Sequence, residues 1–274
     1  MKIKSIPLSL SLLIAAGVAH GSLINFDSAS GFSTGSLNGQ NGWAVSIPGD
    51  ANVVSGGLSY SGGSLVHSGG DQKLALTGGS EARASIGLPS TYAPGSTFYF
   101  SFLFEHDSGD NFLWFAFADG ADNDNNSVAA LAQNAPVAGV AQPRLRTRVR
   151  DTANTSNNGI AGVHDLGNNT TRLVVGEVFF GGDTANTTIT VWLDPTSTLQ
   201  GEAANAQFNA GRNIGITELN TLWIRKGANA GTAFVDHIMI GDSWDAVVIP
   251  EPATYAAFFG LAALGLIVWR RRRN

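Results

Sequence analysis

Short β-rich runs separated by turn residues fill residues 22–249, and they constrain the fold more than any other feature of the chain. The runs are broken by Gly, Asn and Asp, and no amphipathic helical period appears between them. This pattern predicts an all-β, two-sheet antiparallel β-sandwich. No internal repeat of fixed period is present, which disfavours a propeller or a β-helix. The predicted strands are Leu23–Phe26, Gly42–Ser46, Asn52–Val54, Leu58–Tyr60, Lys73–Thr77, Ala82–Leu88, Thr97–His106, Phe112–Ala118, Val128–Gln133, Arg144–Arg150, Arg172–Phe180, Thr187–Leu193, Thr221–Arg225 and Ala233–Ile240.

Two pairs of these strands are predicted to form hairpins. One pair is Thr97–His106 with Phe112–Ala118, and the other is Arg172–Phe180 with Thr187–Leu193. Both connections are rich in Gly, Asp and Asn, which tolerate the backbone conformations of tight turns. The strands of the first pair are apolar on both faces, so we expect both to be central and covered on both sides.

The last 25 residues form a separate unit. Pro250, Glu251 and Pro252 precede an uncharged run of 17 residues, Ala253–Trp269, and the topology arginines follow it. A helix of this run would cover roughly 25 Å, the lower limit for spanning a bilayer core. The arginines should stay cytoplasmic and leave everything before Pro250 outside. These arginines are Arg270, Arg271, Arg272 and Arg273.

This three-part tail, residues 250–274, resembles the PEP-CTERM sorting signal of exported bacterial proteins. The resemblance implies processing by an exosortase, an integral membrane enzyme, and delivery to the cell surface or the extracellular polysaccharide matrix. Ala253 stands where that family often has Ser or Thr. A sorting signal is an address, so it says little about what the protein does at its destination.

The N-terminus agrees with passage through the secretion machinery. Lys2 and Lys4 precede an apolar stretch, and Ala19-His20-Gly21 resembles a small-x-small cleavage site. We therefore expect a signal peptide at residues 1–21, with cleavage after Ala19 as the alternative. Residues 22–249 remain as one ectodomain, long enough for a substantial core.

Charge and cysteine content narrow the function of the ectodomain. Residues 22–249 contain ten Lys and Arg against twenty Asp and Glu, a net charge of −10. An acidic body argues against nucleic acid and anionic lipid as partners. The chain has no cysteine, which excludes thiol catalysis and cysteine metal sites. No cofactor is required by any motif, and calcium is the single metal that the sequence suggests.

Three late segments resemble strands of concanavalin A-like (laminin-G-like) domains: Thr171–Glu177, Thr188–Pro195 and Phe234–Asp245. In that family the final segment returns to pair near the first strand. The fold hosts lectins, hydrolases and inert modules alike. We therefore expect a non-catalytic structural or interaction protein. The alternatives are a carbohydrate-binding adhesin and, third, a glycan hydrolase.

Arginine and tryptophan residues supply the candidate polysaccharide site. Arg144, Arg146, Arg148 and Arg150 alternate with other residues, so on a strand all four would point to one face. Such a stripe could bind carboxylated or sulfated polysaccharide, or it could be a solvated face that discourages edge pairing.

Tryptophans offer a second route to carbohydrate. Trp192 and Trp223 each stand out of phase with aliphatic neighbours, beside polar groups. This arrangement suits stacking on sugar rings, or packing under a loop or against the second sheet.

Acidic residues supply two further hypotheses. Glu105 and Asp107 have the i, i+2 spacing of a glycosidase carboxylate pair, but they also fit solvated acids at the end of a strand. Asp122, Asp124 and Asn126 copy the first half of a calcium loop. Ser127 and Gln133 then replace the glycine and glutamate that a complete loop needs, which leaves a partial calcium site or a flexible acidic loop.

Overall fold

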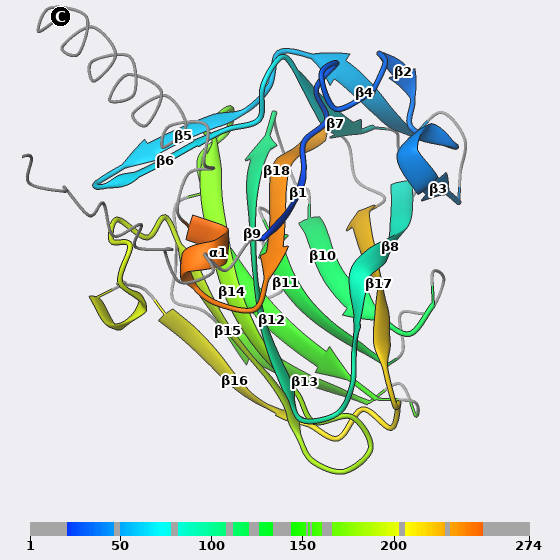
Figure 1. Cartoon of the computed structure of the whole chain (residues 1–274), viewed down its shortest axis with the longest axis vertical. Coiled ribbons are helices and arrows are strands. Elements are labelled where there is room, and N and C mark those ends of the chain that lie inside the picture. The colour runs from blue at the N-terminus through cyan, green and yellow to red at the C-terminus, as the bar shows by residue number, and fades with distance from the viewer. Residues whose placement is uncertain are drawn as a thin grey trace, which may run out of the picture.

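The computed structural model describes a β-sandwich that begins at Gly21 and ends at Val248 (Figure 1). The described residues are 21–46, 50–77, 82–107, 112–120, 126–133, 144–151, 153, 155–160, 166–202, 206–227 and 231–248. The predicted signal peptide therefore lies outside the described residues except for Gly21, and the predicted membrane helix lies outside them entirely. Among the described residues, no helix has the length and apolar character needed to cross a bilayer.

Sheet A has nine strands, in the order β16-β15-β14-β9-β18-β7-β4-β2, with β1 paired to β18. All of its pairings are antiparallel, and β9 lies near the middle, between β14 and β18. Its strands are β1 (Ser22–Ile24), β2 (Gly35–Ser36), β4 (Ala51–Ser55), β7 (Gln72–Leu76), β9 (Ser96–His106), β14 (Arg172–Phe180), β15 (Thr187–Leu193), β16 (Ala206–Arg212) and β18 (Ala233–Gly241).

Sheet B has seven antiparallel strands, in the order β13-β12-β11-β10-β17-β8-β3. Its strands are β3 (Ala44–Val45), β8 (Ala82–Tyr92), β10 (Phe112–Ala118), β11 (Ser127–Gln133), β12 (Arg144–Arg150), β13 (Ser156–Ile160) and β17 (Leu219–Lys226). A separate two-stranded hairpin is formed by β5 (Ser59–Gly62) and β6 (Leu65–Ser68). The short helices are η1 (Gln40–Gly42), η2 (Gln200–Glu202) and α1 (Asp245–Val248).

Phenylalanine rings fill the space between the two sheets. Every second residue of β9 points inward, and Phe100 and Phe102 meet Phe115 of β10 in stacked contacts, with ring centroids 5.5 and 4.1 Å apart. Gly176 of β14 lies opposite Phe100 in the ladder, where a Cβ would overlap the phenyl ring. A glycine here therefore makes room for the larger ring. Each fully buried phenyl side chain contributes roughly 1.5–3 kcal/mol of transfer free energy.

A second apolar cluster covers the outer face of sheet A. Leu103 of β9, Val175 of β14 and Met239 of β18 pack there beneath the β5–β6 hairpin and α1. The hairpin contributes Leu65, the residue before it is Leu58, and α1 contributes Val247 and Val248. The central strands of sheet A are therefore covered on both faces, as their two-sided apolar sequences predict.

The structure confirms the two-sheet antiparallel β-sandwich, the β14–β15 hairpin and the return of the last strand to the first. The predicted hairpin between Thr97–His106 and Phe112–Ala118 is wrong, because β9 belongs to sheet A and β10 to sheet B. Both strands are apolar because their rings face each other across the core. Strands β2, β6, β13 and β16 had no matching prediction.

Candidate functional site

The outer face of sheet B carries the arginines of β12. Leu145 and Val149 point into the core and are fully buried, so the alternation of the strand turns Arg146, Arg148 and Arg150 outward. The side chain of Arg144 lies outside the described residues. The three described arginines of the predicted stripe therefore lie on one face of the sheet.

Two tryptophans lie beside this stripe on the same face. Trp114 of β10 and Trp223 of β17 stack with ring centroids 5.9 Å apart and an interplanar angle of 23°. They pack with Ala116, Ala118 and Ala129, whose small side chains leave room for the indole rings. Trp223 is fully buried, whereas Trp114 is half-buried.

Three arginines contact these rings. The Arg148 guanidinium carbon lies 3.4 Å from the centroid of Trp114, and that of Arg225 lies 5.3 Å from the same ring. Arg83 of β8 lies 5.4 Å from the centroid of Trp223. In a cation–π contact the electron-rich face of the ring attracts the guanidinium group. These contacts therefore hold the arginine side chains in place and offset part of the free energy that their partial burial costs. Burial lowers the pKa of Arg225, although an arginine stays charged at any physiological pH.

We call this set the arginine–tryptophan face. It consists of Arg83, Trp114, Arg146, Arg148, Arg150, Trp223 and Arg225. Sequence reasoning found the β12 arginines and Trp223, but it missed Arg83, Trp114 and Arg225. One signal in the sequence could have found Trp114. It lies between Leu113 and Phe115, which both point into the core, so the alternation of the strand places Trp114 on the outer face. Local sequence does not show that β17 and β8 follow β10 in the sheet, which is what brings Arg225 and Arg83 to this face.

Trp192 lies elsewhere. It belongs to β15 of sheet A, is 5% exposed, and packs edge-on against Trp244 with ring centroids 4.9 Å apart. Its ring is part of the apolar cluster on the outer face of sheet A. The position therefore fits the packing alternative, and a sugar ring cannot stack on Trp192 without displacing Trp244.

Glu105 and Asp107 do not form an open carboxylate pair. Glu105 accepts a hydrogen bond from Thr171 Oγ1 at 3.0 Å and lies 3.6 Å from Lys73 Nζ on the outer side of sheet A. Asp107 accepts the backbone N–H of Thr232 at 2.7 Å, which ties the end of β9 to the start of β18. Each carboxylate therefore contacts and stabilises neighbouring structure, which fits the structural alternative.

The predicted calcium loop is mostly outside the described residues. Asp122 and Asp124 fall in the segment 121–125, whereas Asn126 is described and has a left-handed backbone, with φ of 58°. Within the described segments, no group of three or more His, Cys, Asp or Glu residues could hold a metal ion. Calcium binding by this loop stays a prediction.

Calcium is expected to raise the melting temperature of the ectodomain if the 122–126 loop binds it. A ligand that binds only the folded state stabilises it by mass action, and an excess of 100 times the Kd contributes about 2.7 kcal/mol. Thermal unfolding of residues 22–249 with millimolar calcium, compared with EDTA, measures the effect. Equal melting temperatures in both buffers would exclude the site.

The tail of the chain matches a family model. Residues 248–273 match the PEP-CTERM protein-sorting motif, which confirms the resemblance drawn from Pro250 to Arg273. The motif implies export and a C-terminal sorting signal. Pro250, Glu251, Pro252 and the four arginines themselves lie outside the described residues.

Solved structures with a similar architecture include lectin and carbohydrate-recognition domains. The carbohydrate recognition domain of Emp47p is 13% identical, with a TM-score of 0.42, over 72% of this chain and 90% of that domain. The exoplasmic/lumenal domain of VIP36, bound to Ca²⁺ and Man3GlcNAc, is 10% identical, with a TM-score of 0.44, over 74% and 87%. The carbohydrate-binding module CBM66 from Bacillus subtilis is 9% identical, with a TM-score of 0.42, over 73% and 95%. No curated protein matches the sequence.

Proposed function

We propose that this chain is an exported, non-catalytic β-sandwich protein that binds acidic polysaccharide through the arginine–tryptophan face. The observation that carries the proposal is the gathering of five described arginines on one face of sheet B, around a stacked tryptophan pair. The ectodomain has only ten basic residues, and its net charge is −10. Half of its positive charge is thus concentrated on one face of an acidic body.

The spacing of the arginines suits a linear polyanion. Alternate residues of a strand lie roughly 6.6 Å apart, so a chain lying along β12 meets Arg146, Arg148 and Arg150 in succession. Each planar guanidinium can donate two parallel hydrogen bonds to a carboxylate or a sulfate. Several such contacts made at once give affinity without a deep pocket.

The tryptophans support the arginines in this proposal. Arg148 lies directly over Trp114, and Trp223 is fully buried, so neither ring offers a bare surface to a neutral sugar. The rings instead hold the guanidinium groups at fixed positions before the ligand arrives. Recognition would therefore depend on charge first, and uncharged glycans are expected to bind weakly.

Polysaccharide binding should weaken steeply when Arg146 and Arg148 are both changed to glutamine. Two charge-assisted contacts of roughly 1.5 kcal/mol each would disappear, which predicts a loss of affinity of about 100-fold or more at low salt. Binding of residues 22–249 to a polyuronate, a sulfated glycan and a neutral glucan measures the effect. The parent's affinity for the charged glycans should also fall between low and high salt.

The matched control is the double variant Lys73→Gln/Arg172→Gln. It removes the same number of positive charges, from the Lys73–Glu105 and Arg172–Asp194 ion pairs of sheet A, and leaves the arginine–tryptophan face of sheet B unchanged. This variant should bind like the parent. If both double variants lose affinity equally, net charge and not the face is responsible, and if the parent binds no glycan, the protein is a structural module.

The sorting motif supports a second part of the proposal, concerning place. We infer that an exosortase processes the chain after the signal peptide 1–21 is removed, and that the ectodomain 22–249 is displayed at the cell surface or in the surrounding polysaccharide matrix. A basic face is useful there, because acidic exopolysaccharide would hold the protein in the matrix after processing.

A further inference from the structure

The β5–β6 hairpin, with the preceding Leu58, forms a cover over the outer face of sheet A; we call it the lid. Its two strands pair only with each other and with neither main sheet. Figure 1 shows it as a separate ribbon beside α1 and β18. The lid is held by side-chain contacts and a few hydrogen bonds, so its attachment depends on a small number of groups.

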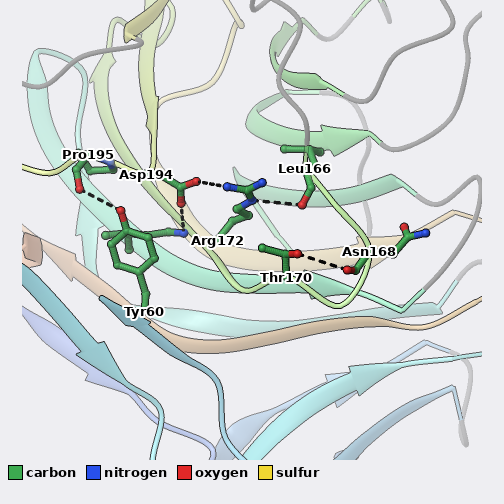
Figure 2. A network of polar contacts seen from close by, with 8 residues as sticks. Tyr60, Leu166, Asn168, Thr170, Arg172, Asp194 and Pro195 are labelled. Carbon is green, nitrogen blue, oxygen red and sulfur yellow. Dashed lines mark hydrogen bonds and ion pairs between the residues drawn. The ribbon is translucent and has the colours of Figure 1, made fainter. Parts of the chain in front are cut away.

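At its outer end the lid touches the segment after β15. Tyr60 donates from its hydroxyl to the Pro195 carbonyl at 3.3 Å, and Ser64 donates its backbone N–H to the Thr196 carbonyl at 3.1 Å. Figure 2 shows Tyr60 beside the ion pair of Arg172 and Asp194, whose atoms are 2.8 Å apart. Burial and the charge of Asp194 raise the pKa of Tyr60 to about 12, so this hydroxyl stays protonated.

The inner end of the lid meets a buried histidine pair. His67 of β6 and His237 of β18 lie edge to face, with ring centroids 5.1 Å apart, and are 1% and 7% exposed. Three ring nitrogens of this pair lack a hydrogen-bond partner of normal geometry: Nδ1 and Nε2 of His67, and Nδ1 of His237. Two imidazolium ions at this distance would repel each other in a poorly solvated space.

The strand beneath the lid is distorted at the same point. The ladder between β18 and β9 shifts register between Asp236 and Met239, and His237 has a left-handed backbone with φ of 47°. A residue in this region is held there by surrounding contacts. Asp236 accepts the backbone N–H of Leu58 at 2.9 Å, so the distorted strand also anchors the start of the lid.

The lid covers the docking place of the chain's last described segment. Val247 and Val248 of α1 are fully buried in the apolar cluster to which Leu58 and Leu65 contribute. Ser101 of β9 donates to the Val247 carbonyl at 2.7 Å and fixes α1 to sheet A. The matched sorting motif begins at residue 248, so the lid lies over the root of the tail.

We propose that the lid is an acid-released cover: protonation of His67 and His237 detaches the β5–β6 hairpin from sheet A and uncovers the docking place of α1 at the root of the sorting tail. The inference does not depend on polysaccharide binding, since the two sites lie on the outer faces of different sheets.

The direction of the pH effect follows from the surrounding charges. Burial, with the neighbouring imidazole, lowers the pKa of His67 to about 3, and burial lowers the pKa of His237 to about 4; the Val248 and Ser68 backbones only partly offset this. In an open lid both groups would return towards 6.5, so the open state binds protons more tightly and gains population as the pH falls below about 6.5.

Asp236 acts in the opposite direction. Burial raises its pKa to about 7, with the charge of Asp27 adding to the rise, so protonated Asp236 favours the closed lid between pH 7 and about 4. The other charged groups around the lid are paired or exposed: Lys73 with Glu105, Arg172 with Asp194, and the exposed Asp242 and Asp245 beside α1. The two histidines favour opening more than the one aspartate opposes it. The ratio of open to closed lid should therefore rise about tenfold when the pH falls from 7.5 to 5.

Thiol labelling tests the proposal, because the natural chain has no cysteine. Leu65→Cys places a thiol under the lid, where Leu65 is fully buried, and Val66→Cys places one on its exposed side, where Val66 is 54% exposed. The probe is a methanethiosulfonate reagent acting on the full-length protein in detergent. The ratio of the Leu65→Cys rate to the Val66→Cys rate cancels the thiol's own pH dependence, and it should rise about tenfold from pH 7.5 to pH 5.

Variants separate the lid from general acid unfolding. In a His67→Phe/His237→Asn background the ratio should fall from pH 7.5 to pH 5, because protonation of Asp236 then acts alone and favours the closed lid. Asparagine is chosen because it accepts the left-handed backbone at 237. His237→Asn alone should abolish the rise, because Asp236 offsets the single remaining histidine, and this variant serves if the double variant does not fold. A His106→Gln control, in which the buried imidazole packed on Phe104 is removed, should keep the full rise.

The proposal is overturned by any of three results. The first is a labelling ratio that is the same at pH 7.5 and pH 5 when both histidines are present. The second is a rise in this ratio that persists in the double histidine variant. The third is a cysteine at Val178, which is fully buried in the core between the sheets, becoming reactive in parallel with Leu65→Cys. That result would show global unfolding instead of lid release.

Discussion

Changing Phe102 to alanine is expected to lower the free energy of unfolding by about 3–5 kcal/mol, the range measured for removing a buried phenyl group from a core. Phe102 is 1% exposed, and its ring stacks on Phe115 of the opposite sheet with centroids 4.1 Å apart. It also lies near Phe100 and Phe104 on its own strand. The substitution would therefore leave a cavity at the contact between the two sheets.

A matched substitution exists on the surface. Phe208 of β16 is 64% exposed, so Phe208→Ala removes the same atoms without opening a cavity and should change stability by no more than about 0.5 kcal/mol. Denaturant unfolding of residues 22–249 for the parent and both variants gives the comparison. Equal costs for the two variants would mean that the phenylalanine contacts between the sheets do not hold the sandwich together.

Changing Pro250 and Pro252 to alanine is expected to leave the full-length protein in the membrane, unprocessed. The two prolines belong to the part of the matched sorting motif that precedes the apolar run, and the run itself stays intact in this variant. Recognition by the processing enzyme should be lost while membrane arrest is kept. A blot of membrane and surface fractions, in a host carrying the exosortase, shows where the chain accumulates.

Replacing Arg270 to Arg273 by neutral residues should have a different outcome. Each arginine costs about 2.5–3.5 kcal/mol at the membrane centre, so the four together form the main barrier to slippage through the bilayer. This second variant should leak or lose its fixed topology. If the proline variant is trimmed and displayed as well as the parent, the apolar run is only an anchor, and the exosortase proposal fails.

Local sequence was sufficient for features that depend on neighbouring residues alone. The alternation along β12 predicted that its arginines share a face, because successive side chains of any strand point to opposite sides. The β14–β15 hairpin was predicted because its strands adjoin in the chain and are joined by a turn-rich connection. The tail was recognised for the same reason: its three parts are contiguous, and no tertiary contact is needed to read them.

Tertiary structure decided most of what depends on which strands become neighbours. β9 and β10 have the pattern of a hairpin, yet they enter different sheets, and a short polar connection is compatible with either arrangement. Trp192 and Trp223 have similar local patterns, yet one packs against Trp244 on sheet A and the other joins the arginine–tryptophan face. His67 and His237 are 170 positions apart and meet only because the lid folds back onto β18. Periodicity shows which side of a strand a residue occupies, whereas the partner on that side is set by the packing of the whole chain.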